Sequence, residues 1–253
     1  MTRSPLIWFG GKSKYAAHII RRFPAHRKYV EPFGGAAHVI AQKPRVTHEG
    51  YNVIDDVVVN FLLQSILDPE RLATECEALP YCRSLYERWK REPLPEDPYE
   101  RVKRWFYMNR CGISKGNVEQ VPQTGWRHST VSGQSPAGGY LTACGLNRRL
   151  CRSTKGVMIE RMDFLELIPK YDDEHTLFYV DPPYVGREKY YAGGFTEDDH
   201  RKLAELLRNV KGKVVLSYYD DPLIYGDWWR ESFDAYKQVV GGDRVGRGQR
   251  NSC

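Results

Sequence analysis

The sequence predicts an α/β protein built on a doubly wound, mostly parallel sheet, with a helical and loop segment inserted into it. Short apolar runs typical of buried strands alternate with segments of helical periodicity. Between residues 68 and 147 this alternation stops, and helical patterns and stretches rich in Gly, Ser, Thr and Asn replace it. We therefore expect residues 1–66 and 152–253 to form one domain around the sheet, and residues 67–151 to form an inserted subdomain.

The first half of the chain contains two predicted strands followed by helices. "KYVEPFGGAAHVI" (28–40) predicts a short strand, a glycine turn and the start of a helix. "YNVIDDVVVNFLLQSIL" (51–67) predicts a strand that ends near Asp55 and then a helix. Residues 68–110 read as helices with breaks at Pro80 and in the proline-rich "REPLPEDPYE". We expect loops to dominate residues 111–147.

The second half returns to alternating strands and helices. "GVMIERMDFLELI" (156–168) predicts a strand and then a helix, and "HTLFYV" (175–180) predicts a buried strand. "TEDDHRKLAELLRNV" (196–210) predicts a helix, because Thr196 is a good N-cap and acidic residues fill the first turn. "GKVVLSYY" (212–219) predicts the next strand.

The composition excludes several classes of protein. With 253 residues, 41% of them hydrophobic and 28% charged, the chain can form a large core. No apolar run approaches the ~20 residues of a membrane span, and no secretory signal begins the chain. The six cysteines are scattered without a C-x-x-C pair, which favours reduced thiols over disulfides or a zinc site. We expect a cytoplasmic protein that binds no membrane and no metal.

Positive charge is concentrated in the middle of the chain. The formal net charge is +6, yet residues 101–155 contain ten basic residues and a single acid, Glu119. A solvated basic face would explain a charge run alone, but here aromatic residues alternate with the cations, which suits contact with phosphates and bases. Nucleic acid is therefore the favoured partner. The aromatic residues are Trp105, Phe106, Tyr107, Trp126 and Tyr140.

Two glycine-containing stretches favour close approach of the backbone to a ligand. "WFGGKSK" (8–14) contains part of the phosphate-loop pattern, but Leu6 stands where that pattern needs its first glycine, so an NTPase is excluded. "VEPFGGAAHV" (30–39) follows a predicted strand, at the point where doubly wound sheets bind ligands. Glu31 is placed to meet a cationic or amino group, although an ordinary surface carboxylate is the alternative.

Acidic residues follow two further strands. Asp55 comes about 20 residues after the glycine turn, where such folds often hold ribose hydroxyls, and Asp56 is an equally placed alternative. Asp163 and Phe164 follow the strand at 156–162, and such a pair can bind and stack on an adenine ring. A helix N-cap is the alternative explanation for each acid.

The stretch "FYVDPPYVG" (178–186) is the most specific signal. The prolines end the strand and present a carboxylate and an aromatic ring rigidly. Asp181-Pro182-Pro183-Tyr184 resembles the DPPY motif of amino-group methyltransferases. The whole chain from about residue 6 to 236 is similar to Dam-like (D12 class) adenine-specific DNA methyltransferases, whose motifs occur in the same order. The matching stretches are "WFGGKSK", "VEPFGGAAHV", "YMNRCG", "YYAGGFTEDDHRKLAELL" and "VVLSYYDDPLIYGDW".

The resemblance implies a class I, Rossmann-like methyltransferase that uses S-adenosyl-L-methionine to methylate the N6 amino group of adenine. The substrate would be a specific sequence in double-stranded DNA, with the target base flipped out, and residues 67–151 would recognise it. The implied catalytic residues are Asp181, Pro182, Pro183 and Tyr184. The implied cofactor-binding residues are Trp8, Gly10, Lys12, Glu31, Phe33, Gly35, Asp55, Asp163, Phe164 and Asp181. The candidate DNA-binding residues are Lys12, Arg110, Lys115, Arg127, Arg148, Arg149 and Tyr190.

Three departures from the family pattern lead to expectations of their own. Ala37 stands where relatives usually carry a second glycine and His38 where serine is common, so we expect tolerable crowding and weaker cofactor binding. The glycine- and arginine-rich end, "GGDRVGRGQRNSC", reads as a loop whose following strand is missing, which would leave a sheet edge exposed.

The alternatives to an active DNA adenine methyltransferase are a weak or inactive DNA-binding relative and an enzyme acting on RNA. We also expect a monomer, with a cognate restriction endonuclease as a possible partner.

Overall fold

Five parallel strands form the main sheet, in the order β3-β2-β1-β4-β5. The computed structural model describes residues 3–8, 10–113, 125–129, 133, 135–184, 194–219, 228–234 and 250–252. The parallel α/β fold expected from the sequence is thereby confirmed. The strands are β1 (Lys28–Glu31), β2 (His48–Asn52), β3 (Met158–Glu160), β4 (Thr176–Val180) and β5 (Lys213–Leu216).

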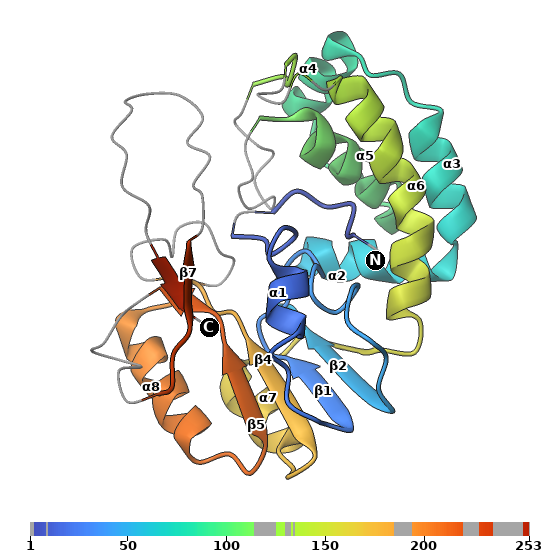
Figure 1. Ribbon diagram of the computed structural model, residues 1–253. Coiled ribbons are helices and arrows are strands. Elements are labelled where there is room, and N and C mark those ends of the chain that lie inside the picture. Colours follow the sequence, from blue (N-terminus) through green and yellow to red (C-terminus); the bar gives the residue numbers. More distant parts are fainter. Residues whose placement is uncertain are drawn as a thin grey trace.

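Helices cover both faces of this sheet (Figure 1). All five residues of β4 are buried, and they alternate between two cores: Leu177 packs in one hydrophobic cluster and Phe178 in the other. The Phe178 side is covered by α7 (Phe164–Tyr171) and α8 (Glu197–Arg208). The Leu177 side is covered by α1 (Ala16–Ile20) and α2 (Asp56–Leu67). A strand buried on both faces needs no polar alternation, which is why "LFYV" has none.

Three helices begin where the sequence predicts a cap. The side chains of Asp55, Asp163 and Thr196 accept backbone hydrogen bonds at the starts of α2, α7 and α8. Thr196 forms a full capping box with Asp199. These caps set the ends of the loops that follow β2 and β3 and the start of the helix that precedes β5.

The segment between β2 and β3 is mostly helical and lies beside the sheet (Figure 1). It contains α3 (Pro69–Glu77), α4 (Arg83–Arg91), α5 (Pro98–Cys111) and α6 (Pro136–Thr154), with the expected breaks after residues 77 and 91. Most of its buried apolar residues, and those of α2, belong to the same hydrophobic cluster as Leu177 and Tyr179 of the sheet. The helical segment therefore shares a core with the main sheet.

The prediction that loops dominate residues 111–147 was wrong for residues 136–147, which form the first part of α6. Gly138, Gly139 and Gly145 suggested a loop, but the stronger local signal is Ser135-Pro136, an N-cap followed by proline in the first turn. Helical spacing then buries one stripe of the helix against α2, α3 and α5. Packing of that stripe outweighs the low helix propensity of glycine. The stripe contains Tyr140, Ala143, Cys144, Asn147, Leu150 and Cys151.

Two other expectations are corrected. The residues after the glycine turn, 38–42, form hydrogen-bonded turns and no helix. The C-terminal stretch, which we expected to lack a strand, contains β8 (Arg250–Ser252). It pairs antiparallel with both β6 (Tyr218–Tyr219) and β7 (Ser232–Asp234) in a second, three-stranded sheet. A three-residue strand flanked by Gly and Arg leaves almost no periodic pattern in the sequence.

Candidate active site

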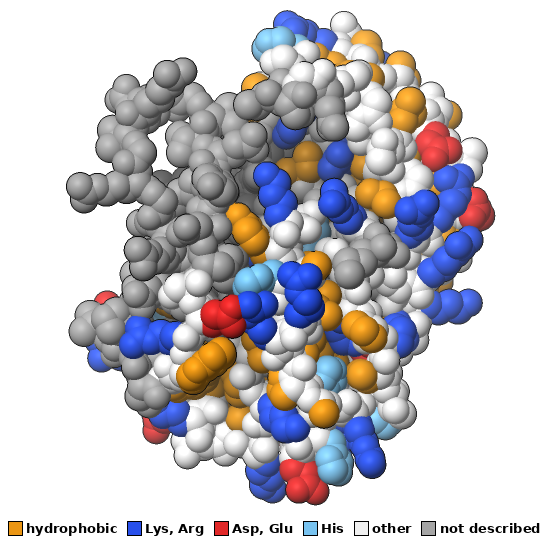
Figure 2. Space-filling model, viewed as in Figure 1, with side chains coloured by type: hydrophobic (Ala, Val, Ile, Leu, Met, Phe, Trp, Pro, Cys, Tyr) orange, Lys and Arg blue, Asp and Glu red, His pale blue; other side chains and the backbone are white. Residues whose placement is uncertain are grey.

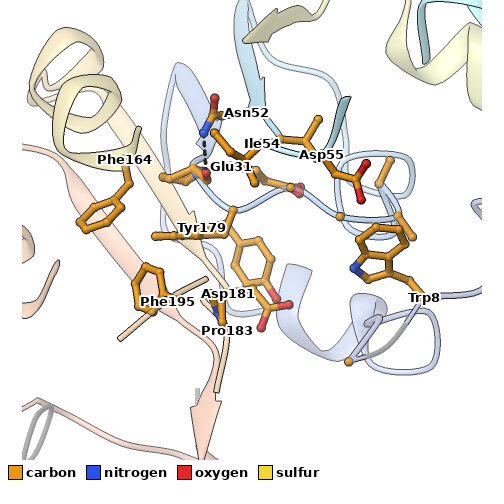
Figure 3. A pocket seen from close by; sticks show the side chains of 18 of the residues that line it. Trp8, Glu31, Asn52, Ile54, Asp55, Phe164, Tyr179, Asp181, Pro183 and Phe195 are labelled. Atoms are coloured by element: carbon orange, nitrogen blue, oxygen red, sulfur yellow. Dashed lines mark hydrogen bonds between the residues drawn. The ribbon is translucent and has the colours of Figure 1, made fainter. Parts of the chain in front are cut away.

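A cavity of about 420 Å³ opens at the carboxyl ends of β1, β2 and β4, where the order of the strands reverses. This is the usual ligand site of a doubly wound sheet, and the volume suits a small organic ligand. Figure 3 shows side chains from several loops directed into it. The structure brings together every residue predicted to bind a cofactor. These residues are Trp8, Gly10, Lys12, Glu31, Phe33, Gly35, Asp55, Asp163, Phe164 and Asp181.

The glycine turn after β1 is packed tightly by protein side chains. A Cβ on Gly34 would lie 2.4 Å from the ring of Tyr51, and one on Gly35 would lie 2.6 Å from the indole nitrogen of Trp8. We expected these glycines to admit a ligand to the backbone. In the structure, the side chains of Tyr51 and Trp8 fill the space that a Cβ on these glycines would need. This packing fixes Trp8 as a wall of the cavity.

Aromatic rings gather at one end of the cavity (Figure 3). The ring of Phe33 lies 5.4 Å from that of Phe164 and 5.5 Å from that of Phe195. Phe164 and Phe195 are themselves 5.6 Å apart. These contacts place Phe33 beside Phe164. An apolar, aromatic end of this kind suits a flat heterocyclic ring.

Glu31 is a buried acid at the end of β1. Its carboxylate accepts a hydrogen bond from the hydroxyl of Tyr29 at 2.7 Å, and only 5% of the residue is exposed. Burial raises the pKa of Glu31 to about 7, and the nearby charge of Asp181 adds to this, while Tyr29 and Lys43 oppose it. A cationic ligand group in the cavity would favour the ionised form.

The acids that follow β2 and β3 are both helix caps and cavity walls. Asp55 accepts a hydrogen bond from the backbone N–H of Val57 at 3.0 Å, is almost fully buried and lines the cavity. Its alternative, Asp56, is directed elsewhere and pairs with Arg161 at 2.8 Å. Asp163 likewise caps α7 and lines the cavity. Capping therefore fixes these carboxylates without removing them from the site.

Sequence reasoning missed Asn52, which joins three loops of the site. Its side-chain amide donates to the carbonyl oxygens of Pro32, at 2.8 Å, and Met162, at 2.9 Å. Its side-chain oxygen accepts from the backbone N–H of Met162 at 2.9 Å. Asn52 is buried at the end of β2. An asparagine at the end of a buried strand was the available signal, because such an amide must find partners.

Asp181 lies at the end of β4 in contact with Lys12 and Tyr184. The Lys12 ammonium nitrogen lies 2.6 Å from Oδ1 and 2.7 Å from Oδ2, and it also donates to the carbonyl oxygen of Gly10. The Tyr184 hydroxyl donates to Oδ1 at 3.3 Å. Burial raises the pKa of Asp181 above its ordinary value, and Lys12 and Tyr184 counteract part of that rise. Of the DPPY residues, Asp181 and Pro183 line the cavity, while Pro182 and Tyr184 lie buried beside them.

The predicted DNA-binding arginines differ in how many hydrogen bonds and ion pairs they form within the protein. Arg110 donates to the carbonyl oxygens of Pro5 and Gly139, and Arg127 donates to that of Gly112. Burial, and secondarily Arg127, lowers the pKa of Arg110 to about 10. Arg148 is paired with two acids of α3, whereas Arg149 is exposed. Lys115 and Tyr190 lie outside the described residues.

Comparison with known families decides what kind of protein carries this site. The model of the D12 class N6 adenine-specific DNA methyltransferases matches residues 8–239. The chain belongs to this family. Among curated relatives of this methyltransferase is the retron Ec67 DNA adenine methylase of Escherichia coli, 23% identical over 251 residues that cover 87% of this chain and 78% of that protein. Another is the type II methyltransferase M.MjaIII of Methanocaldococcus jannaschii, 23% identical over 272 residues that cover 93% and 90%.

The family match runs from the first glycine stretch past the residues of the cavity and the DPPY residues, so the protein is an adenine-specific DNA methyltransferase. DNA is accordingly the substrate of this methyltransferase. Among the described residues, no helix is both long and apolar enough to cross a bilayer.

Proposed function

We propose that the protein transfers the methyl group of S-adenosyl-L-methionine to N6 of adenine within a specific duplex DNA sequence. The observation that carries this proposal is the position of Asp181: its carboxylate lines the cavity and is also held by Lys12 and Tyr184. A methyl donor in the cavity and an amino group at Asp181 would therefore lie side by side, as direct transfer requires.

The chemistry of the cavity fits S-adenosyl-L-methionine. This cofactor has an adenine ring, two ribose hydroxyls and two cationic groups, a sulfonium and an ammonium. The aromatic end formed by Phe33, Phe164 and Phe195 suits the ring, and Asp163, which also lines the cavity, would accept from its amino group. Asp55 is the acid best placed for the ribose. Glu31, which also lines the cavity, suits the ammonium, and the bound cofactor supplies the electrophilic methyl group.

The residues around Asp181 would prepare the target amine. The N6 lone pair of adenine is delocalised into the ring, so the amine is a weak nucleophile. When the Asp181 carboxylate and the carbonyl oxygen of Pro182 accept from the two N6 protons, electron density returns to nitrogen and the growing positive charge is stabilised. The amine would replace the Lys12 ammonium at one carboxylate oxygen. Tyr184, held against Tyr218 at 5.2 Å, would bound the base pocket.

Reaching this pocket requires the adenine to leave the duplex, so we include base flipping in the proposal. Residues 67–151 would form the recognition subdomain, and residues 1–66 and 152–253 the catalytic domain. We also propose that the enzyme acts as a cytoplasmic monomer, and a restriction endonuclease of the same specificity is a candidate partner. The free cysteines of the described chain fit a reducing compartment.

A methyl-transfer assay with radiolabelled S-adenosyl-L-methionine and unmethylated duplex DNA tests the proposal. We expect label in the DNA with the wild type and a loss of at least about a hundredfold with Asp181→Asn. Asp198→Asn, an exposed acid paired with Lys202, is the matched control and should retain activity. Sequencing of DNA from expressing cells would then give the base and site. Equal labelling by wild type and Asp181→Asn, or labelling of RNA in preference to DNA, would contradict the proposal.

A further inference from the structure

Tyr51 lies directly beneath the glycine turn that borders the cavity. Its hydroxyl donates a hydrogen bond to the carbonyl oxygen of Gly35 at 2.7 Å and accepts one from the backbone N–H of Ala37 at 2.9 Å. The residue belongs to β2 and is 1% exposed. One buried hydroxyl thus holds two backbone groups on either side of Ala36.

Ala37 needs such support, because its backbone is left-handed. Its φ of 54° is the one positive value among non-glycine residues in the described part of the chain. A side chain makes this conformation costly, whereas glycine adopts it freely. The alanine that departs from the family pattern therefore strains the backbone. Residues Ala36, Ala37 and His38 all line the cavity, while Tyr51 does not.

We propose that Tyr51 is a positioning residue for cofactor binding, which holds the turn at 34–37 in shape by stabilising the left-handed Ala37. The inference rests on the proposed function, since it takes the cavity to be the cofactor site. Tyr51 acts through the backbone of the turn. Its ring also fills the space above Gly34, where a Cβ would approach it to 2.4 Å. Removal of the hydroxyl alone is therefore the informative change.

Calorimetric titration with S-adenosyl-L-methionine tests this inference. Tyr51→Phe keeps the ring but leaves the Ala37 amide and the Gly35 carbonyl without this partner, so we expect affinity to fall about tenfold. KM for the cofactor should rise by a similar factor with kcat changed much less. Tyr140→Phe is the matched control, because it removes a buried hydroxyl that donates to the carbonyl oxygen of Cys76 in the helical segment. It should lower stability without changing cofactor affinity.

A double-mutant cycle with Ala37→Gly separates positioning from general loss of stability. Glycine accepts the left-handed conformation unaided, so Tyr51→Phe should cost markedly less affinity in the Ala37→Gly background than in the wild type. An equal loss in both backgrounds, or no loss in either, would overturn the inference. If the wild type itself fails to bind S-adenosyl-L-methionine, the proposed function fails instead, and the two failures are thereby distinguished.

A different observation carries a second proposal. A cavity of about 410 Å³ lies beside the end of α6, and four of its seven lining residues are basic. On the face drawn in Figure 2, Lys and Arg side chains gather over the helices α3 to α6, with few acidic side chains among them. The lining residues are Ile40, Ala41, Lys43, Arg45, Arg149, Arg152 and Ser153.

The cations of this cavity fall into two groups. Lys43 pairs with the buried Glu49, and Arg45 binds Glu49 together with the carbonyl oxygens of Ser153 and Lys155, so both are held in place. Arg149 and Arg152 are one helical turn apart on α6 and exposed, and neither side chain has a hydrogen bond or ion pair within the described structure. Arg148, their neighbour, is instead occupied by Glu70 and Glu77.

We infer that Arg149 and Arg152 bind a phosphate group, with Arg45 as a fixed positive charge behind it. Guanidinium groups suit phosphate geometry, and the cluster carries more cations than the protein neutralises. A phosphodiester of the DNA substrate and a free phosphate offer the same chemistry.

Salt-dependent DNA binding, measured by fluorescence anisotropy, distinguishes the two sources. For a long duplex we expect the Arg149→Ala/Arg152→Ala variant to reduce the salt slope by about two, while a short duplex limited to the methylated site shows a smaller change. Arg201→Ala, at an exposed arginine of α8 that pairs with Glu197, is the matched control and should leave the slope unchanged. Binding of inorganic phosphate to the wild type, lost in the double variant while the DNA slope is unchanged, would assign a free phosphate. No change with either ligand would overturn the inference.

Discussion

The Lys12 ammonium nitrogen lies within 2.7 Å of both carboxylate oxygens of Asp181, although 169 positions separate the two residues. The lysine side chain is 8% exposed and the aspartate side chain 21%. The pair lies where the cavity meets the residues of the DPPY motif. In the proposed reaction the target amino group replaces the lysine ammonium at one carboxylate oxygen of Asp181.

Removing the lysine charge should shift the pH dependence of methyl transfer. Burial already raises the pKa of Asp181, and Lys12→Gln removes the ion that counteracts this rise, so the pKa should rise further. In the proposed reaction the ionised carboxylate is the active form, so rate is lost as pH falls through that pKa. The acid limb of the pH–rate profile should therefore move to higher pH. Lys14→Gln removes an exposed lysine of the same segment and should leave the limb in place; an unmoved limb in Lys12→Gln would refute the role.

Glu31 should make the free protein less stable as pH rises. Its pKa is about 7 when folded and 4.5 ordinarily, so ionisation costs folding free energy that appears from about pH 4.5 and is complete above about pH 7. Relative to Glu31→Gln, the wild type should lose on the order of 3 kcal/mol across this range. Denaturant unfolding at several pH values measures the difference. Glu174→Gln, at a 79% exposed carboxylate, should show no such trend. Parallel curves for wild type and Glu31→Gln would contradict the expectation.

Gly35→Ala should specifically damage the cavity that we propose as the cofactor site. The added Cβ would meet the indole nitrogen of Trp8 at 2.6 Å, so the indole must move and the cavity wall with it. We expect weaker cofactor binding by calorimetry together with a change in tryptophan fluorescence. Gly139→Ala is the matched control: this helical glycine has open space around its Cβ position, so alanine should raise stability by about 0.5–1 kcal/mol and leave binding intact. Unchanged fluorescence and affinity in Gly35→Ala would disprove the packing argument.

The buried Lys43–Glu49 pair should be expensive to break. Both side chains are 1% exposed, and desolvation lowers the pKa of Lys43. Glu49→Gln leaves an uncompensated buried ammonium, which should cost about 3–5 kcal/mol in chemical denaturation. Lys43→Met combined with Glu49→Met should lie closer to the wild type than either single change. As a control, Arg201→Met at an exposed ion pair should cost less than about 1 kcal/mol. A double variant as unstable as the singles would show that the pair itself, and not the stranded charge, holds this region.

Local signals were sufficient for much of the fold. Buried apolar runs marked β4 and β5, and Asp55, Asp163 and Thr196 marked three helix starts. Where a competing signal was present, prediction was wrong. Three glycines hid α6, whose stability comes from the stripe that includes Tyr140 and Leu150. β8 was missed because a short strand held by neighbours on both sides needs no pattern of its own.

The candidate site divides in the same way. Acids at strand ends and the DPPY stretch could be read directly, and the cavity gathers them. The structural roles of Tyr51 and Asn52 could not, because each depends on loops distant in sequence: Tyr51 holds the turn at 34–37, and Asn52 binds Pro32 and Met162. The sequence also does not tell which arginines form ion pairs within the protein, as Arg148 does with Glu70.

The hydrophobic cluster shared by the sheet and the helices α2 to α6 bears on any attempt to engineer this enzyme. Phe61 of α2 packs against Trp105 and Phe106 of α5, and Tyr140 of α6 lies 6.4 Å from Phe106. Exchanging residues 67–151 for the equivalent part of another methyltransferase would cut through these contacts. In a working chimera, the residues of α2 that contact the exchanged segment would have to be replaced as well. The new DNA specificity and the packing of the core would therefore need to be designed together.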